Sequence, residues 1–271
     1  MIPRLVVFRG AGDLATGAAH RLWNSGFHVI MLELPKPLVV RRTVSFASAV
    51  YEGSIVVESV EAELCSSVDT VFKCLEAGKV PVLSDPRSES LSILQPKIIV
   101  DAIMAKTGQT STIHDAELVI GLGPGFFAGR DVNTVIETKR GHSLGKVFYV
   151  GSAAEDTAEP GIIEGYGIER LLRAPTGGTL KPLKAIGDIV QAGEAVAVVN
   201  DLIIKAEIDG LIRGMLYPGV EVATGTKVGD IDPRGTSVDF CAISDKARAI
   251  GGGVLEAIMH RYLLKNNADM L

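Results

Sequence analysis

The first half of the chain alternates short, continuously apolar runs with stretches of helical period. The apolar runs lie at Leu5–Phe8, Phe27–Leu32, Val80–Leu83, Ile98–Val100 and Leu118–Ile120. Runs that are apolar at every position are typical of strands buried on both faces of a parallel sheet. The segments between them, such as Gly12–Gly26 and Ser66–Ala77, have the spacing of amphipathic helices. We therefore predict an α/β domain over residues 1–150, Rossmann-like, with a mostly parallel sheet.

The pattern changes near residue 133, where Thr134–Glu137 and Lys146–Val150 predict the two strands of a hairpin. Short strands separated by glycine turns then follow. They resemble the barrel-sandwich hybrid of biotinyl and lipoyl carrier domains, and we predict such a β-rich module over residues 151–240. The expected hairpin tip at Val199–Leu202 holds no lysine, so a carrier role is not expected.

Residues 241–271 predict a C-terminal helical segment that packs back on the first domain. This segment contains three consecutive glycines, Gly251–Gly253, each of which costs helix stability. We interpret them as a close approach to another element, and a second anion-binding loop is the alternative.

The first strand runs into a Gly-x-Gly-x-x-Ala turn. In such a turn Gly10 bends the chain, Gly12 leaves room for phosphates, and Ala15 lets the helix lie close to the sheet. The amides around Asp13 then face an anion at the helix N-terminus. Glu33 ends the next strand, about 20 residues on, where an acid binds ribose hydroxyls. The pattern predicts a nucleotide or dinucleotide site. The alternative is that the glycines only close a tight turn.

Two further groups are candidates for cofactor binding. Gly121, Gly123 and Gly125 offer backbone amides without side chains, which suits an anion or a flat ligand. Arg41 and Arg42 follow a proline-containing loop, where their guanidinium groups could clamp a phosphate. An exposed surface pair is an equally good interpretation of the two arginines.

The carboxyl ends of parallel strands meet at one edge of a sheet, where open α/β sheets bind their ligands. We expect Gly10, Glu33, Asp101 and Gly121 to converge there. The candidates for catalytic roles are Asp101, Asp131 and His142, although carboxylates at strand ends equally often cap the following helix. No Cys-x-x-Cys or His-x-x-x-His spacing occurs, and no metal site is predicted.

Composition narrows the function classes. The 271 residues carry a net charge of −5, which argues against broad nucleic-acid binding. No apolar run reaches the roughly 18 residues that a membrane span needs. Three scattered cysteines fit reduced thiols in a cytoplasm, and Cys65 and Cys74 are interpreted as small buried apolar side chains.

Four stretches together match a known family: Phe8–Gly17, Leu34–Phe46, Gly121–His142 and Gly229–Arg234. Over nearly its whole length the chain resembles the YqeB-type accessory proteins of the selenium-dependent molybdenum hydroxylase system. The resemblance implies a cytoplasmic bacterial or archaeal protein that helps mature molybdenum hydroxylases of the purine-oxidising kind. It implies no established reaction and no catalytic residues.

We therefore predict a maturation factor that binds a nucleotide or dinucleotide, such as molybdopterin cytosine dinucleotide, and assists its modification or delivery. Its partners would be the molybdenum hydroxylase or the proteins that assemble its cofactor, and homo-oligomerisation is left open. One alternative is an NAD-dependent oxidoreductase in selenium or molybdenum cofactor chemistry. Glu33 would then favour NAD over NADP. A second alternative is a module that docks the hydroxylase.

Overall fold

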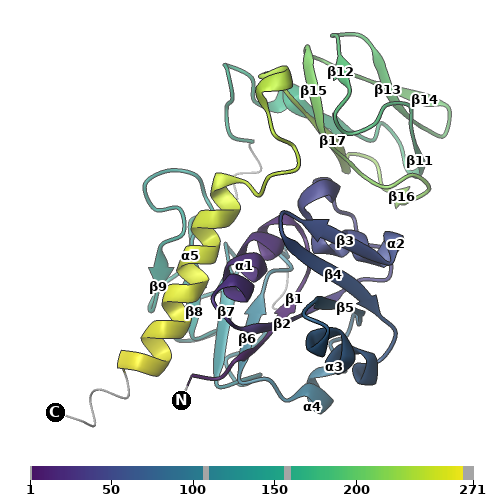
Figure 1. Cartoon of the computed structure of the whole chain (residues 1–271). Coiled ribbons are helices and arrows are strands. Elements are labelled where there is room, and N and C mark those ends of the chain that lie inside the picture. The colour runs from purple at the N-terminus through teal and green to yellow at the C-terminus, as the bar shows by residue number, and fades with distance from the viewer. Residues whose placement is uncertain (1, 106–109, 156–159, 265–271) are drawn as a thin grey trace. The chain divides into compact units, whose positions relative to one another are not determined.

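A computed structural model describes residues 2–105, 110–155 and 160–264. The chain forms two compact units (Figure 1). Unit 1 contains Met1–Pro37, Ser45–Asp156 and Ile243–Leu271, and unit 2 contains Leu38–Val44 and Thr157–Ala242. The chain thus enters unit 2 twice, and its C-terminal segment belongs to unit 1. Among the described residues, no helix is long and apolar enough to cross a membrane.

A nine-stranded sheet with the order β3-β4-β5-β2-β1-β6-β7-β8-β9 forms the centre of unit 1. Its bounds are β1 Leu5–Arg9, β2 His28–Glu33, β3 Ser54–Val57, β4 Val60–Cys65, β5 Val80–Ser84, β6 Ile98–Asp101, β7 Leu118–Leu122, β8 Thr134–Ile136 and β9 Val147–Phe148. The seven strands from β4 to β8 in this spatial order, β4-β5-β2-β1-β6-β7-β8, are all parallel to their neighbours within it. Successive residues Val6, Val7 and Phe8 of β1 are all fully buried, as expected for a strand covered on both faces.

The sheet is mixed, because both of its edge strands are antiparallel to their neighbours. Strand β3 pairs with β4 and strand β9 with β8, each as a hairpin. Only Glu58 and Ser59 connect β3 to β4, and a connection that short cannot cross over to a parallel strand. The predicted hairpin at β8–β9 is confirmed, whereas β3 and β4 were not predicted. The predicted Rossmann-like fold is wrong for this mixed sheet, although its central strands are parallel as expected.

The helices of unit 1 are α1 Asp13–Asn24, α2 Ala49–Glu52, α3 Val68–Glu76, α4 Leu91–Leu94 and α5 Asp245–Met259, with short helical turns η2 Phe46–Ser48 and η5 His260–Leu264. Helices α1 and α5 lie side by side (Figure 1). A Cβ on Gly251 would lie 3.0 Å from the Gly17 carbonyl oxygen, and a Cβ on Gly253 would overlap the carbonyl oxygen of Gly145. The packing interpretation is therefore confirmed for Gly251 and Gly253, whereas a Cβ on Gly252 would meet nothing within 4 Å.

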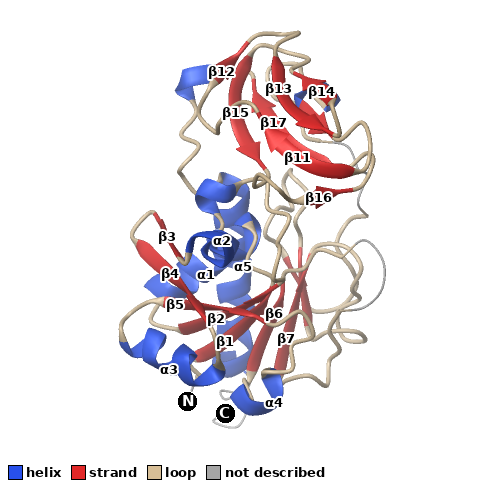
Figure 2. Ribbon diagram, turned by 90° about the vertical axis from the view of Figure 1, so that its right-hand side faces the viewer, coloured by secondary structure: helices blue, strands red, loops and turns tan. Residues whose placement is uncertain are grey.

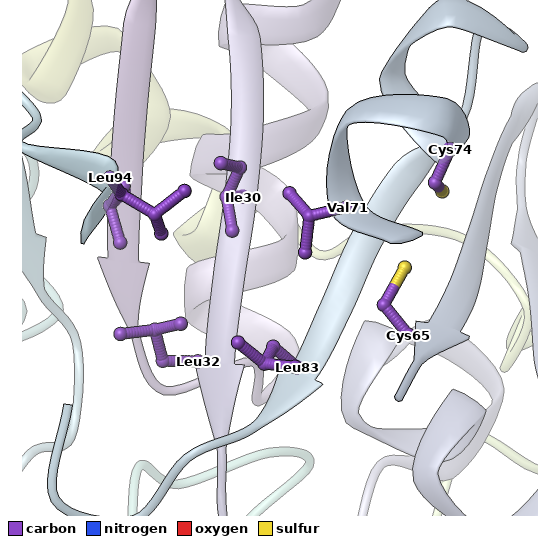
Figure 3. Close-up of a cluster of buried hydrophobic side chains, with 8 residues drawn as sticks. Ile30, Leu32, Cys65, Val71, Cys74, Leu83 and Leu94 are labelled. Carbon is purple, nitrogen blue, oxygen red and sulfur yellow. The ribbon is translucent and has the colours of Figure 1, made fainter. Parts of the chain in front are cut away.

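Helices α3 and α4 pack on the sheet through a cluster of buried side chains (Figure 3). The cluster includes Val7 and Ile30 of the sheet, together with Cys65 at the end of β4 and Cys74 on α3. The two sulfur atoms point toward one another (Figure 3). Burial raises the pKa of the Cys65 thiol and raises that of Cys74 to about 12. Both thiols therefore stay protonated at neutral pH, and their interpretation as small apolar side chains is confirmed.

Unit 2 consists of two four-stranded antiparallel sheets, with the orders β10-β17-β15-β12 and β14-β13-β11-β16 (Figure 2). The strands are β10 Leu171–Arg173, β11 Gly178–Pro182, β12 Ile189–Val190, β13 Ala195–Val199, β14 Leu202–Lys205, β15 Gly210–Met215, β16 Glu221–Val222 and β17 Lys227–Asp232. Three short helical turns complete the unit: η1 Arg42–Val44, η3 Ile168–Arg170 and η4 Gly235–Ser237.

The predicted biotinyl/lipoyl-like barrel-sandwich module is wrong for unit 2. The glycine turns and short strands occur as expected, but the unit is not formed by residues 151–240 alone. The unit also includes a segment from far upstream, because the Met215 N–H donates to the Val40 carbonyl oxygen at 2.9 Å. A repeated strand-and-turn pattern specifies short strands and leaves their pairing partners open.

Candidate functional site

The carboxyl ends of the central strands meet at one edge of the sheet of unit 1, as predicted. Arg9 is in register with Leu32 of β2 and with Asp101 of β6, and Asp101 is in register with Gly121 of β7. The structure therefore brings Gly10, Glu33, Asp101 and Gly121 to the same edge.

Gly10 makes the tight turn after β1. Its φ is +95°, and a Cβ there would lie 3.0 Å from the Ala102 carbonyl oxygen, so the turn requires glycine. Gly12 precedes α1 in extended backbone, and a Cβ on it would meet nothing within 4 Å. Asp13 lies in the first turn of α1, where a carboxylate is favourable, and Ala15 is buried.

In this turn, the N–H and the carbonyl oxygen of Ala11 are hydrogen-bonded to other groups of the protein. The Ala11 N–H donates to Glu33 Oε2 at 2.8 Å, and the Leu34 N–H donates to Glu33 Oε1 at 2.7 Å. The Ala47 N–H donates to the Ala11 carbonyl oxygen at 2.9 Å. Burial raises the pKa of Glu33, which the two amide hydrogen bonds partly offset. The Glu33 carboxyl group thus lies at the Ala11 amide of the turn, and its contact with ribose hydroxyls stays a prediction.

The second glycine loop is also packed by the protein's own side chains. A Cβ on Gly121 would lie 2.5 Å from the Phe126 ring, and one on Gly123 would lie 2.7 Å from Thr138 Oγ1. Gly125 has a φ of +103° and faces open space apart from a distant carbonyl. Gly121 and Gly123 therefore make room for packing.

Asp101 belongs to a buried polar network. It accepts hydrogen bonds from the Ser111 hydroxyl at 2.6 Å and from the Ile103 N–H at 3.2 Å. Arg9 Nη1 donates to Ser111 Oγ at 2.7 Å and lies 3.8 Å from Asp101 Oδ2. These contacts hold the loop that follows β6 against the end of β1.

The other two catalytic candidates lie in different local settings. Asp131 is buried and accepts a pair of hydrogen bonds from Arg130, at 2.8 and 2.9 Å, and one from the Phe127 N–H at 2.8 Å. It closes its own loop. His142 is exposed in the connection between β8 and β9.

Arg41 and Arg42 belong to unit 2, not to the unit of the glycine turn. Arg41 is buried. The Arg42 guanidinium lies over the Tyr217 ring, 4.4 Å from its centroid. The exposed surface pair is therefore wrong for these two residues.

Sequence reasoning missed a group of buried charges on β15 and at the end of β17. Asp232 is fully buried and accepts hydrogen bonds from Arg234 Nε at 2.9 Å and Nη2 at 2.7 Å. Arg213 Nε lies 3.8 Å from Asp232 Oδ2. Arg213 interrupts the register between β15 and β17, and such a bulge re-aims the side chain of its extra residue.

Arg170 and Asp230 extend this group. Arg170 is buried, donates to the carbonyl oxygens of Ile231 at 3.2 Å and Gly161 at 3.1 Å, and places Nη2 3.9 Å from Asp230 Oδ2. Lys227 Nζ lies 3.9 Å from Asp230 Oδ1. We call these residues the arginine cluster: Arg170, Arg213, Lys227, Asp230, Asp232 and Arg234.

Positive charge exceeds negative charge in the arginine cluster, and the pKa directions reflect this. Burial alone would raise the pKa of Asp232, but the hydrogen bonds and charge of Arg234, with the charge of Arg213, hold it below its usual range. Burial lowers the pKa of Arg170. Asp230 and Asp232 oppose this, and the neighbouring Arg213 and Arg234 add to it. The Gly229–Arg234 stretch was singled out only through the family resemblance. Its partners Arg170 and Arg213 belong to other segments of the chain and are not visible as a local motif.

A second polar network ties α1 to the β3–β4 hairpin and α5 in unit 1. His20 of α1 is buried, with Nε2 3.6 Å from Glu58 Oε2. Glu58 also pairs with Arg248 and accepts a hydrogen bond from the Ile243 N–H at 3.0 Å. Burial lowers the pKa of His20. The charge of Glu58 opposes this shift, while Arg248 and Arg21 reinforce it.

Acidification should therefore destabilise the chain through His20. The pKa of His20 is lower in the folded than in the unfolded chain. The neutral side chain therefore contributes its full stabilisation of the fold above the ordinary pKa of 6.5, and this stabilisation is lost as the pH falls below 6.5. We expect His20→Gln to make the free energy of unfolding less dependent on pH. Urea unfolding from about pH 8 to about pH 5 measures this. His28→Gln, at an exposed site, is the control, and equal slopes in wild type and His20→Gln would contradict the prediction.

Among the described residues, no group of three or more His, Cys, Asp or Glu side chains could hold a metal ion.

No family model matches the chain. The chain is 50% identical over 256 residues to the uncharacterized protein YqeB of Escherichia coli K12, a match that covers 94% of this chain and 47% of that protein. It thus spans about half the length of the curated relative it matches. The likeness to YqeB is confirmed, and that relative's name states no activity.

Three solved structures also resemble the chain. An aspartoacylase family protein from Mesorhizobium loti has a TM-score of 0.27 and 10% identity, with 85% of each chain covered. A succinylglutamate desuccinylase from a Silicibacter species has a TM-score of 0.24 and 10% identity, again with 85% of each chain covered. The ectoine utilization protein EutE from Ruegeria pomeroyi has a TM-score of 0.23 and 11% identity, with 83% of this chain and 56% of that chain covered. TM-scores this low assign no activity to the chain.

The predicted function is corrected, because neither the relative YqeB, whose name states no activity, nor the similar structures give it any support. In the turn itself, Glu33 accepts the Ala11 N–H, and the Ala47 N–H donates to the Ala11 carbonyl oxygen. The maturation factor, the NAD-dependent oxidoreductase and the docking module are therefore not supported. A ligand role for single residues at the strand ends stays a prediction, as do the oligomeric state and the absence of nucleic-acid partners.

Proposed function

We propose that the chain binds a small oxyanion at the arginine cluster of unit 2. The observation that carries the proposal is a buried guanidinium donor, Arg213 Nε, that has no hydrogen-bond partner among the described residues. Among the same described residues, Arg170, Arg213, Lys227 and Arg234 lie near two carboxylates, those of Asp230 and Asp232.

A buried donor without an acceptor is costly, and the oxygen of a bound anion would offset that cost. Arg213 Nε is buried without a hydrogen-bond partner among the described residues. Guanidinium groups present several N–H donors in a fixed plane, which matches carboxylate and phosphate oxygens.

The cluster also reaches solvent, as a binding site must. The side chain of Arg234 is 42% exposed and that of Lys227 is 40% exposed, whereas Arg213 is 15% exposed and Arg170 only 6%. An oxyanion arriving from solvent meets Arg234 or Lys227 first, and the buried arginines add to the attraction.

Calorimetric titration of the full chain with inorganic phosphate at low ionic strength tests the proposal. We expect saturable binding that weakens as salt is added. Arg213→Gln should weaken binding about tenfold or more, because a hydrogen bond to a charged group contributes about 1.5–3 kcal/mol. Lys181→Gln, which removes one positive charge from the other sheet of unit 2, should leave binding unchanged. No binding by wild type, or equal binding by Arg213→Gln, would overturn the proposal.

A further inference from the structure

Asp230 has a buried acceptor atom, Oδ1, to which no described residue donates a hydrogen bond. Its side chain is 6% exposed, and Oδ1 has no hydrogen-bond partner among the described residues. The nearest cation, Lys227 Nζ, lies 3.9 Å away, too far for a hydrogen bond. A Cβ on Gly214 would lie 2.5 Å from this oxygen, so the glycine makes space for the carboxylate. A buried acceptor without a donor is costly and calls for an explanation.

An unmet donor lies next to this acceptor along the paired strands. Asp230 is in register with Gly214, the residue after Arg213, whose Nε is also buried and unpartnered among the described residues. Asp230 and Asp232 lie two positions apart on β17 and so share a face of the sheet, and Arg213 approaches Asp232 on that face. The cluster therefore offers an N–H donor and a carboxylate acceptor together.

We propose that Asp230 makes the cluster selective for oxyanions that carry a hydroxyl hydrogen, of which hydrogen phosphate is the simplest; this inference rests on the proposed function. The bare oxygens of such an anion accept hydrogen bonds from the arginines. Its hydroxyl donates to Asp230 Oδ1. Sulfate has the same shape and charge but no hydrogen. Its oxygen therefore cannot donate to the Asp230 carboxylate, and the two acceptors repel each other. Hydroxy acids satisfy the same two requirements that hydrogen phosphate does.

The test compares phosphate and sulfate by calorimetric titration of the full chain at about pH 8, where phosphate keeps a proton and sulfate has none. We expect wild type to bind phosphate at least about tenfold more tightly than sulfate. Asp230→Asn supplies an amide N–H, which a sulfate oxygen accepts, so this variant should lose the preference. Asp201→Asn, at the exposed tip of the β13–β14 hairpin, removes the same charge and should keep it.

A second pair of probes asks the same question of wild type alone, in case Asp230→Asn does not fold. Lactate carries the hydroxyl that propionate lacks, and we expect lactate to bind more tightly. Equal affinities within both pairs, or an unchanged phosphate preference in Asp230→Asn, would overturn the selectivity and leave the proposed function intact. Binding of none of the four anions would overturn the proposed function, and the selectivity with it.

Discussion

Gly253→Ala is expected to lower the free energy of unfolding by about 1–3 kcal/mol, the usual range for overpacking a tight contact. A Cβ on Gly253 would overlap the Gly145 carbonyl oxygen and lie 3.0 Å from Ile136 Cγ2. Gly145 cannot easily retreat, because its φ of +80° suits glycine and a Cβ there would lie 2.6 Å from the Ala249 carbonyl oxygen. Helix α5 and the β8–β9 connection therefore meet backbone to backbone.

The neighbouring glycine supplies the matched control. A Cβ on Gly252 would meet nothing within 4 Å, so Gly252→Ala should raise the free energy of unfolding by about 0.5–1 kcal/mol through helix propensity. Urea unfolding of both variants and wild type measures the difference. If both substitutions stabilise the chain, α5 does not make the close contact at Gly253.

Asp232→Asn is expected to lower the free energy of unfolding by about 3–5 kcal/mol, as when one partner of a buried ion pair is removed. The substitution keeps the shape of the side chain and removes its charge. Arg234 then loses its paired hydrogen bonds to a carboxylate, and Arg213 and Arg170 lose a nearby negative charge. Asp201→Asn, at an exposed turn, should change stability little.

The pH dependence gives this prediction a second readout. The pKa of Asp232 is lower in the folded than in the unfolded chain, so its contribution is present above the ordinary value of 3.8 and is lost as the pH falls through the lowered pKa. Wild type should therefore lose more stability on acidification than Asp232→Asn does. Urea unfolding at neutral pH and at about pH 3 measures both effects. Equal stability of the two proteins at neutral pH would show that Asp232 does not compensate the arginines.

Most strands of unit 1 could be predicted from the local pattern of apolar residues in the sequence. The apolar runs that form β1, β2, β5, β6 and β7 were recognised because burial on both faces leaves no polar position in a strand. The strand ends then followed, since parallel neighbours end at the same edge. Strands β3 and β4 were missed, because β4 begins with polar positions alternating with apolar ones and β3 is only four residues long.

The candidate site was harder to predict than the fold. Glu33 stands where a ribose-binding acid was expected, yet its carboxylate accepts the Ala11 amide of the turn itself. The same residues serve either purpose, and the choice depends on which groups surround the turn. The arginine cluster gave no local signal, because Arg170 donates to a carbonyl 61 positions away and Arg213 faces Asp232 only through a bulge.

The sequence by itself determined where the chain turns and which segments are buried, as at Gly10 and in the apolar run of β1. Local sterics and side-chain period act over a few residues, and both are written in consecutive positions. Only the tertiary structure decided which polar groups meet: Glu33 with the Ala11 amide, and Asp230 and Asp232 with Arg170, Arg213 and Arg234. Those meetings depend on strand pairing, register and one bulge, which side-chain packing selects over the whole unit.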